Sequence, residues 1–546
     1  MDSIEVVLAM LLAVVASGYL VRMLPFSMPL PLVQIALGAL VAAVTVHGVA
    51  LDPEIFFLLF LPPLLFLDGW RIPKTGLFRD KGIILALAFG LVVFTVLGAG
   101  LLVHWLIPAM PLEVAFAFAA IVSPTDPVAV SSIAARVPIP KRLMHILEGE
   151  SLLNDASGLV CFRFAVAAVM TGSFSLGTAS LTLVWVSLAG VAAGVAVTLG
   201  VSLAQSWLSR HFGEESGSPI LINLLTPFGA YLVAEHVQAS GILAAVAAGI
   251  TMSYVELSGR ALATTRVQRA AVWEMVQFTL NGIMFVLLGE QLPGILRRAA
   301  DSVEEAGHLS PWWLLAYVLA IGAILVLLRF CWVWAAWRFS LFKARRQGGA
   351  LPKPRLRIIA VMALAGVRGA VTLAGVLTLP LLLPDGAEFP ARDLVIFLAA
   401  SVILLSLLLA SVGLPRVLEG LTLPEEPADR LEEDLARHEA ALAALAAIES
   451  THHALAAESG ADADLYANAA VRVMADYRHR IDDRAVPGTV DAGHLRQADR
   501  AEVALRLAAL KAERETVFKL ARDTAISDEI SRKLVRQIDL MEARYR

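Results

Sequence analysis

Residues 119–130 read AAIVSPTDPVAV, so two prolines and an aspartate interrupt an otherwise apolar segment. Each proline removes a backbone hydrogen-bond donor and clashes with the preceding helical turn. A regular helix therefore cannot continue through Pro124 and Pro127, and the backbone around Asp126 must open. The apolar residues on both sides still favour helix, so the stretch predicts two half-helices separated by a polar break.

The composition of the whole chain indicates what surrounds this break. Hydrophobic residues make up 58% and charged residues 17% of the 546 positions, and the mean hydropathy is +0.73. Soluble domains carry about 25% charged residues, so the bilayer must be the solvent. About thirteen nearly uncharged segments are each long enough to cross a hydrocarbon core about 30 Å thick. They are 4–21, 28–46, 53–69, 82–107, 112–134, 144–170, 178–207, 218–236, 240–254, 271–292, 311–337, 357–383 and 394–413.

Segments of this length predict an all-α membrane protein, because the strands of a membrane barrel need only about ten residues each. The first segment has no basic stretch before it and no small-residue cleavage site after it, so we expect a retained span. The predicted loops on one side hold nearly all the Lys and Arg, including the cluster at 343–357. The positive-inside rule then predicts a multi-pass protein of a bacterial inner membrane, with its N-terminus outside and its C-terminus in the cytoplasm.

The composition changes abruptly near Glu425, and the remaining residues are rich in charge. We expect a transmembrane domain at 1–418 and a cytoplasmic helical domain at 419–546. Apolar residues recur at helical spacing in 429–448 and 495–521, so three or four helices are expected in this tail. The tail either packs against cytoplasmic loops or its own copy, or it contacts a regulatory small molecule or ion, and the sequence leaves both readings open.

Ionisable residues inside the spans are the strongest candidates for function, because each is costly in the hydrocarbon core. At a helical rise of about 1.5 Å per residue, Asp126, Asp155 and Arg368 each lie roughly 16 to 21 Å along their spans, near the middle of the bilayer. We therefore expect three spans to bring these charges together. The sequence assigns no role to Arg163 or Arg329. The full set of candidates is Asp68, Asp126, Glu150, Asp155, Arg163, Glu235, Glu274, Arg329 and Arg368.

A second interruption, GVRG at 366–369, places a charge among small, permissive residues in the twelfth span. Interrupted segments in corresponding places of two halves point to the binding site of a secondary transporter. The fifth and twelfth spans enter from opposite sides, so we expect two inverted six-helix repeats with crossed broken helices. Asp126 and Arg368 can compensate the partial charges of the half-helix ends. The freed carbonyls near Ser123 and Thr125 are oxygen ligands, which hard cations prefer.

The sixth span contains ESLLND at 150–155, in which Ser151 lies one helical turn from Asp155. A carboxyl group away from water favours its protonated form, whereas a bound cation favours the carboxylate. We infer that Asp155 holds either a proton or a cation, and that competition between the two is the basis of exchange. Glu150 lies one turn from Asn154 on the same span. We expect Glu150 and Arg368 either to form a buried ion pair that supports the site or to take a direct part in transport.

Five motifs occur in order over residues 57–375: FLPPLLF at 60–66, SPTDPVAV at 123–130, EGESLLNDA at 148–156, SGILA at 240–244 and GVRGAV at 366–371. Together they resemble the NhaP-type sodium/proton antiporters of the monovalent cation:proton antiporter superfamily. The resemblance implies a thirteen-helix fold with crossed broken helices, a homodimer embedded in lipid, and alternating access. It also implies that the chain exchanges Na+ or Li+ for H+.

The resemblance assigns roles to individual residues of this chain. It implies that Asn154 before Asp155, in place of a second acid, marks the branch that exchanges one cation for one proton. The family often has an acid directly after FLPPLLF, but here that position is Leu67 and the acid is Asp68, about 100° around the helix. We therefore treat Asp68 as an accessory residue. The implied Na+- and proton-binding residues are Asp155, Asp126, Thr125 and Ser151, and the implied stabilising residues are Asn154, Glu150 and Arg368.

Other functions are less consistent with these residues. Potassium/proton exchange at the same site stays open, because oxygen ligands alone do not fix the size of the cation. A cation channel with a regulatory tail would normally have a filter made of carbonyl loops or charged rings. An intramembrane aspartyl protease would carry a Gly-x-Gly-Asp motif, which is absent. Cys161 and Cys331 predict neither a disulfide nor a metal cluster, and we expect no enzymatic activity, no cofactor and no nucleic-acid partner.

Overall fold

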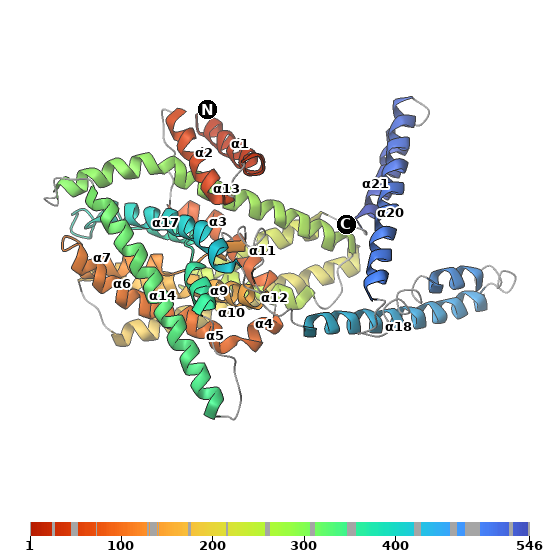
Figure 1. Cartoon of the computed structure of the whole chain (residues 1–546), viewed down its shortest axis with the longest axis horizontal. Helices are drawn as coiled ribbons and strands as arrows, with labels where there is room; N and C mark the ends of the chain where they lie inside the picture. The colour runs from red at the N-terminus through yellow and green to blue at the C-terminus, as the bar shows by residue number, and fades with distance from the viewer. Residues whose placement is uncertain are drawn as a thin grey trace. The chain divides into compact units, whose positions relative to one another are not determined.

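The chain separates into two compact units, Met1–Leu421 and Thr422–Arg546. Regular structure within the described residues is helical apart from one isolated bridge between Leu382 and Glu388 (Figure 1). The computed structural model describes residues 2–24, 28–44, 53–72, 74–127, 130–131, 139, 141–172, 176–213, 217–256, 263–305, 312–346, 356–419, 427–458, 467–475, 492–523 and 528–543.

The first unit is a bundle of apolar helices. Among the described helices, seven are long and apolar enough to cross a membrane: α1, the continuous run from α5 to α6, α9, α10, α13, α14 and α17. Three shorter apolar helices, α2, α7 and α12, lie in further predicted spans. The helices are α1 (Asp2–Met23), α2 (Leu30–Val44), α3 (Pro53–Arg71), α4 (Lys74–Arg79), α5 (Lys81–Leu85), the π-helical segment η1 (Ala86–Leu91), α6 (Val92–Leu106), α7 (Leu112–Val122), α9 (Lys141–Thr171), α10 (Leu176–Phe212), α11 (Ser218–His236), α12 (Gly241–Glu256), α13 (Ala263–Glu305), α14 (Trp312–Arg346), α15 (Leu356–Leu364), α16 (Ala370–Leu377) and α17 (Arg392–Leu418).

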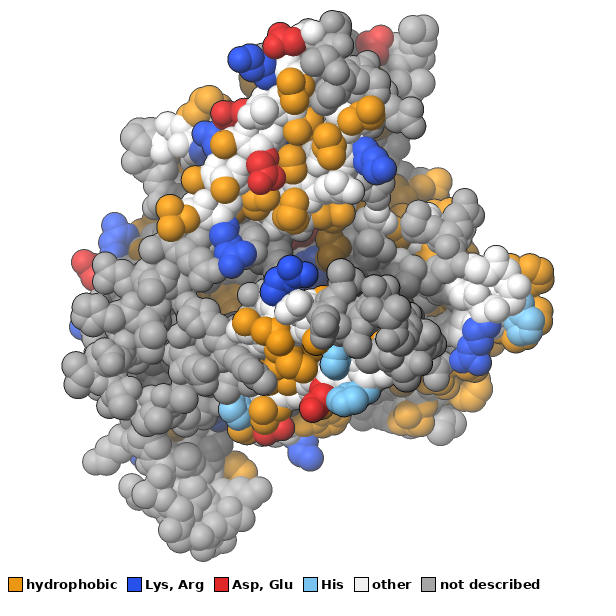
Figure 2. Space-filling view, turned by 90° about the vertical axis from the view of Figure 1, so that its right-hand side faces the viewer, with side chains coloured by type: hydrophobic (Ala, Val, Ile, Leu, Met, Phe, Trp, Pro, Cys, Tyr) orange, Lys and Arg blue, Asp and Glu red, His pale blue; other side chains and the backbone are white. Residues whose placement is uncertain are grey.

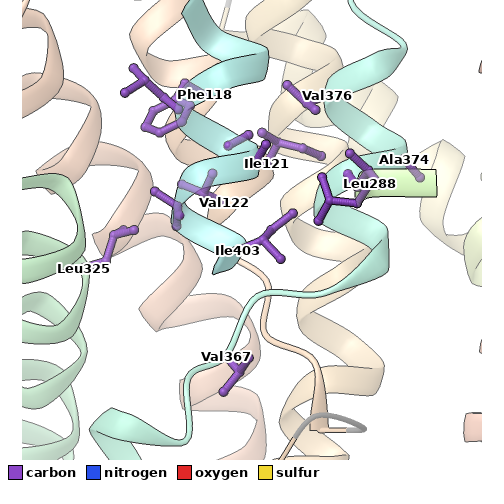
Figure 3. Packing of buried hydrophobic residues seen from close by; sticks show 14 of the residues in the cluster. Phe118, Ile121, Val122, Leu288, Leu325, Val367, Ala374, Val376 and Ile403 are labelled. Carbon is purple, nitrogen blue, oxygen red and sulfur yellow. The ribbon is translucent and has the colours of Figure 1, made fainter. Parts of the chain in front are cut away.

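Both predicted helix breaks are confirmed. Helix α7 ends at Val122, and residues 124–126, between Ser123 and Pro127, have no regular structure. Helix α15 ends at Leu364, and the backbone is extended or turned until α16 begins at Ala370. Figure 3 shows Val367 on the strand-like segment that connects these half-helices.

The centre of the first unit is built around α7, whose residues from Val114 to Val122 are almost all inaccessible to solvent. Small side chains such as those of Ala117, Ala119 and Ala120 let neighbouring helices approach it closely. A half-helix buried on all sides cannot reach water at its broken end, so its terminal carbonyls require partners from the protein. Figure 3 shows its neighbours in the core, which include Leu288 of α13, Leu325 of α14, Ala374 and Val376 of α16, and Ile403 of α17.

The outward surface of the first unit is apolar. Figure 2 shows one face of the whole chain, on which hydrophobic side chains are exposed with charged and histidine side chains between them. Exposed apolar residues on this scale are unusual for a protein that folds in water and normal for one that faces lipid. Large exposed side chains in the first unit include Trp105, Leu188, Leu203, Phe212 and Trp312.

One predicted span is not a regular α-helix. Its middle, η1, is π-helical, which leaves backbone carbonyls outside the usual ladder of hydrogen bonds. The indole Nε1 of Trp332 donates to the carbonyl oxygen of Ala86 at 3.1 Å, and the hydroxyl of Ser157 donates to that of Ala88 at 2.6 Å. At the start of this span, just before α5, the carboxylate of Asp80 accepts hydrogen bonds from Arg142 of α9 at 2.7 and 3.3 Å.

The second unit contains α18 (Pro427–Glu458), α20 (Ala492–Arg522) and α21 (Asp528–Glu542). The two helices expected at 429–448 and 495–521 lie within α18 and α20. Arg514 of α20 bonds to two acids of α21, Asp539 at 2.9 Å and Glu542, so these helices form a pair. The cytoplasmic location and regulatory role of this unit stay predictions.

Candidate functional site

A small cavity lies where the first helix break meets α3, α9 and α13. It holds about 30 Å³ of space for the centres of water-sized molecules, and one water needs about 10–15 Å³. There is thus room for about two waters or for a small cation that keeps part of its hydration. Three carboxylates reach this space: Asp68, Asp126 and Asp155. Its lining residues are Leu64, Leu65, Asp68, Pro124, Thr125, Asp126, Pro127, Ser151, Asp155, Gln277, Asn281, Gly369, Val371 and Thr372.

The cavity is lined by all four residues that were predicted to bind the cation. Asp155, Asp126, Thr125 and Ser151 all line it, although they come from two separate segments of the chain. Asp155 and Ser151 are buried, with 7% and 4% of their surfaces exposed. Asp68 lines the same cavity, so its offset from the expected position on α3 does not remove it from the site.

The two helix breaks meet beside this cavity. The backbone N–H of Asp126 donates to the carbonyl oxygen of Val367 at 2.7 Å, which joins one break directly to the other. Gly369 packs against the Asp126 side chain so closely that a Cβ atom there would lie 1.8 Å from Oδ2 of Asp126. Only glycine leaves enough room for this carboxylate, so Gly369 fixes where Asp126 lies.

Arg368 caps the end of α7 instead of lining the cavity. Its Nε donates to the carbonyl oxygen of Val122 at 3.0 Å, and its Nη1 donates to that of Gly366. The backbone N–H of Arg368 donates to the hydroxyl of Ser406 at 3.0 Å. A guanidinium group at the C-terminal end of a half-helix neutralises the partial negative charge there. This placement agrees with the compensating role that the sequence indicated for Arg368.

The predicted ion pair between Glu150 and Arg368 is wrong. Glu150 pairs instead with Arg329 of α14, whose Nη1 and Nη2 donate to the two carboxylate oxygens, the second at 2.7 Å. Both side chains are at most 2% exposed. Arg329 also donates from Nε to the carbonyl oxygen of Met362 at 2.8 Å, near the end of α15. One arginine thus satisfies the carboxylate of α9 and an end carbonyl of the second broken helix.

The hydroxyl of Thr125 connects this ion pair to the first break. It accepts a hydrogen bond from Nδ2 of Asn154 at 3.0 Å and donates to Oε1 of Glu150 at 3.5 Å. Asn154 and Glu150 therefore hold Thr125 in place without lining the cavity themselves. Among the described residues, two buried oxygens near the break have no hydrogen-bond partner, Ser123 Oγ and Asn154 Oδ1.

The sequence analysis gave no role to four residues of the site: Arg329, Gln277, Asn281 and Thr372, a buried residue of α16 that lines the cavity. Arg329 was set aside, although it is an arginine in an apolar span and such a residue needs a partner. Gln277 and Asn281 of α13 line the cavity, but they are uncharged and belong to none of the motifs. Their spacing of four residues, which places both on one helix face, was the only signal that could have found them.

The oxygen atoms around the cavity are suitable ligands for a cation that binds reversibly. They are carboxylate, hydroxyl and amide oxygens, which hard cations prefer to nitrogen or sulfur. Within the described ranges, no three His, Cys, Asp or Glu side chains cluster as a metal site by themselves, so a cation in the cavity also needs hydroxyl, amide or backbone oxygens. The arrangement combines exchangeable oxygen ligands with carboxylates that can also take up protons.

Comparison with known proteins agrees with this arrangement. Residues 8–420 match the family described as "Sodium/hydrogen exchanger, transmembrane". The chain is 42% identical to the uncharacterized Na+/H+ exchanger YjcE of Escherichia coli strain K12, over 100% of this chain and 99% of that protein. It is 38% identical to the sodium, potassium, lithium and rubidium/H+ antiporter of Bacillus subtilis strain 168, over 100% of this chain and 78% of that protein.

A solved structure has the same fold. The sodium proton antiporter MjNhaP1 from Methanocaldococcus jannaschii superposes with a TM-score of 0.57 at 17% identity, covering 77% of this chain and 99% of that one. The expected all-helical membrane fold is therefore confirmed, and the matched family is one of transporters, not enzymes. The chain belongs to the sodium/hydrogen exchanger family and is a multi-pass cation/proton antiporter.

Proposed function

We propose that this antiporter exchanges Na+ or Li+ for H+ at Asp155 by alternating access. The observation that carries the proposal is the cavity that Asp155, Asp126 and Asp68 line beside two hydrogen-bonded helix breaks. A cavity with room for one partly dehydrated cation, lined by the buried carboxylate of Asp155, makes the cation and the proton compete for the same negative charge.

Each residue of the site has a distinct proposed role. Asp155 binds the cation or the proton, and Ser151, Asp126 and Thr125 supply further oxygens from the cavity wall. Asp68 reaches the cavity from α3 and acts as an accessory carboxylate. The remaining residues act by position, because Asn154 and Glu150 bond to Thr125, and Arg368 caps α7.

Several finer features belong to the same proposal. The exchange is electroneutral, with one cation for one proton, because Asn154 stands where a second acid would add a charge. Thirteen spans form two inverted repeats of six helices, with the N-terminus outside and the C-terminus in the cytoplasm. The protein functions as a homodimer in the lipid bilayer, and its helical tail packs on the cytoplasmic side or contacts a regulatory small molecule or ion.

Potassium/proton exchange is the second candidate. The Bacillus subtilis relative is described as an antiporter of sodium, potassium, lithium and rubidium, and it aligns with the whole of this chain. The cavity oxygens do not fix the size of the cation, so the same site can serve K+ if this larger ion keeps less of its water. The two candidates differ only in the preferred cation.

Proton flux in proteoliposomes tests both candidates. A trapped pH dye reports the flux after addition of Na+, Li+ or K+, and valinomycin in K+-balanced buffers clamps the voltage. Dye recovery on addition of Na+ that persists under the clamp is the expected result. A larger response to K+ than to Na+ favours the second candidate, dependence on the clamp contradicts electroneutrality, and no response to any cation contradicts both candidates.

Gly369→Ala should reduce transport while leaving most of the fold intact. The added Cβ would overlap the Asp126 carboxylate and force it to move, and displacements of about 1 Å in a site can cost up to about a hundredfold in rate. We expect transport to fall by about ten- to a hundredfold. The matched control is Gly82→Ala, where a Cβ meets nothing within 4 Å. Equal transport in the two variants would show that the position of Asp126 does not matter.

A further inference from the structure

Arg71 and Gln277 connect α3 to α13 beside the cavity. Nη1 of Arg71 donates to Oε1 of Gln277 at 2.6 Å. An arginine side chain carries only donors, so the amide atom that faces it must be the carbonyl oxygen. The hydrogen bond therefore fixes the orientation of the Gln277 amide, and Gln277 in turn holds the guanidinium group in one place.

The guanidinium group lies at the rim of the cavity. Gln277 is itself a lining residue, and Arg71 follows the lining residue Asp68 by three positions, about one helical turn, in the last turn of α3. Arg71 is exposed, whereas Asp155 has only 7% of its surface exposed. A positive charge thus stands on the solvent side of a cavity that contains three carboxylates.

We propose that Gln277 is a positioning residue that holds the charge of Arg71 at the rim, so that Arg71 weakens binding of every monovalent cation in the cavity. The inference rests on the proposed function, because it requires a cation and a proton to compete at Asp155. A bound proton and a bound Na+ carry the same charge, so the field of Arg71 weakens both by the same factor. The pair thereby sets the concentration and pH ranges in which the antiporter works.

Other charged groups lie near this rim. The cavity is lined by Asp68 on α3, Asp126 at the first break and Asp155 on α9. Glu148 on α9 lies within electrostatic range of Asp68, and Glu256 on α12 pairs with Arg269 on α13 beside Trp70, the neighbour of Arg71. The variants substitute none of these residues, so a difference between variants that alter only position 71 reports the effect of the charge at that position.

Arg71 weakens the binding of Na+ and of the proton by the same factor, so its removal should change the KM for Na+ in a way that depends on pH. At alkaline pH, where protons do not compete, Arg71→Gln should lower the KM for Na+ by about three- to tenfold. At acid pH the KM should stay unchanged, because proton binding strengthens by the same factor. The pH at which protons begin to inhibit should rise by the logarithm of that factor, about 0.5 to 1 unit. Maximal turnover of Arg71→Gln should change little, since Arg71 has no oxygen to offer the cation.

The test measures KM and turnover from pH 6 to 9 in proteoliposomes that contain the full-length protein. The variants are Arg71→Gln, Arg71→Lys, Gln277→Leu and the double variant Arg71→Gln/Gln277→Leu. Arg71→Lys keeps the charge and should resemble the wild type. Gln277→Leu frees the guanidinium and should shift KM in the same direction as Arg71→Gln but by less. The double variant should match Arg71→Gln, because positioning has no effect without the charge.

A matched control removes a charge elsewhere. Arg416 is exposed near the end of α17, and its hydrogen bond to Val412 stays within its own helix. Arg416→Gln should leave KM unchanged at every pH. The inference is overturned if Arg71→Lys behaves like Arg71→Gln, if KM shifts equally at all pH values, or if the Gln277→Leu effect adds to that of Arg71→Gln. Failure of the proposed function is a separate result, because the wild type itself would then show no cation response.

Discussion

Asp155→Asn should abolish cation-driven proton flux and leave a folded protein. Asparagine has nearly the same shape as aspartate, but it neither releases a proton nor neutralises a cation at neutral pH. Asp155 lines the cavity and has only 7% of its surface exposed, so removing a charge that is costly to bury should not weaken the fold. Flux in proteoliposomes is expected to fall to the level of protein-free liposomes for Na+, Li+ and K+ alike.

The control for this prediction changes a carboxylate of the same type outside the cavity. Asp393 at the start of α17 is 39% exposed and pairs with Arg298 at 3.4 Å. Asp393→Asn should transport at nearly the wild-type rate. Size-exclusion profiles and melting temperatures establish that both variants are folded. Wild-type transport by well-folded Asp155→Asn protein would remove the central claim about this carboxylate.

Glu150→Gln should lower stability more than cation affinity. The carboxylate of Glu150 pairs with Arg329 at a position where both side chains are almost inaccessible to water. Removing one charge leaves the other buried without compensation, which typically costs about 3–5 kcal/mol. We expect a much lower folded yield and a melting temperature reduced by about 5–15 °C, with the KM of the surviving protein within about threefold of the wild type.

Two further variants make this prediction specific. Glu150→Leu with Arg329→Leu removes both charges and should recover part of the lost stability, because replacing a buried pair by apolar residues is often neutral. Recovery should be incomplete, since Met362 loses the donor to its carbonyl oxygen. Arg298→Gln breaks a partly exposed pair and should cost no more than about 1 kcal/mol. A Glu150→Gln protein as stable as the wild type, but with strongly altered KM, would assign Glu150 to cation binding instead.

Local chemistry in the sequence was sufficient to predict the helix breaks and their positions. Two prolines flanking Asp126 forbid a regular helix wherever the chain packs, and helical rise alone puts Asp155 and Asp126 at similar depth. The structure accordingly brings both into one cavity. These predictions succeeded because they depend on neighbours along the chain.

The partner of Glu150 could not be predicted in the same way. Arg329 and Arg368 both lie in apolar spans, and the choice between them depends on how α14 packs against α9 and α15. No spacing in the sequence reports that packing. Arg368 directs its Nε to the carbonyl oxygen of Val122 and its Nη1 to that of Gly366 instead of to Glu150. Gln277 and Asn281 were missed for a related reason. A neutral amide in an apolar span can face lipid, a neighbouring helix or a cavity, and only the fold shows which.

The π-helical segment η1 determines how the two ends of its span are rotated relative to each other. A wide turn of this kind corresponds to one residue inserted into a regular α-helix, and each helical residue turns the chain by about 100°. Asp80 must face Arg142 at one end while Gly98, beyond the wide turn, faces Leu328 of α14. Loss of a single residue from Ala86–Leu91 would thus rotate one end of the span by about 100° and break one of these contacts. Evolution can therefore exchange residues in this segment far more easily than it can change the segment's length.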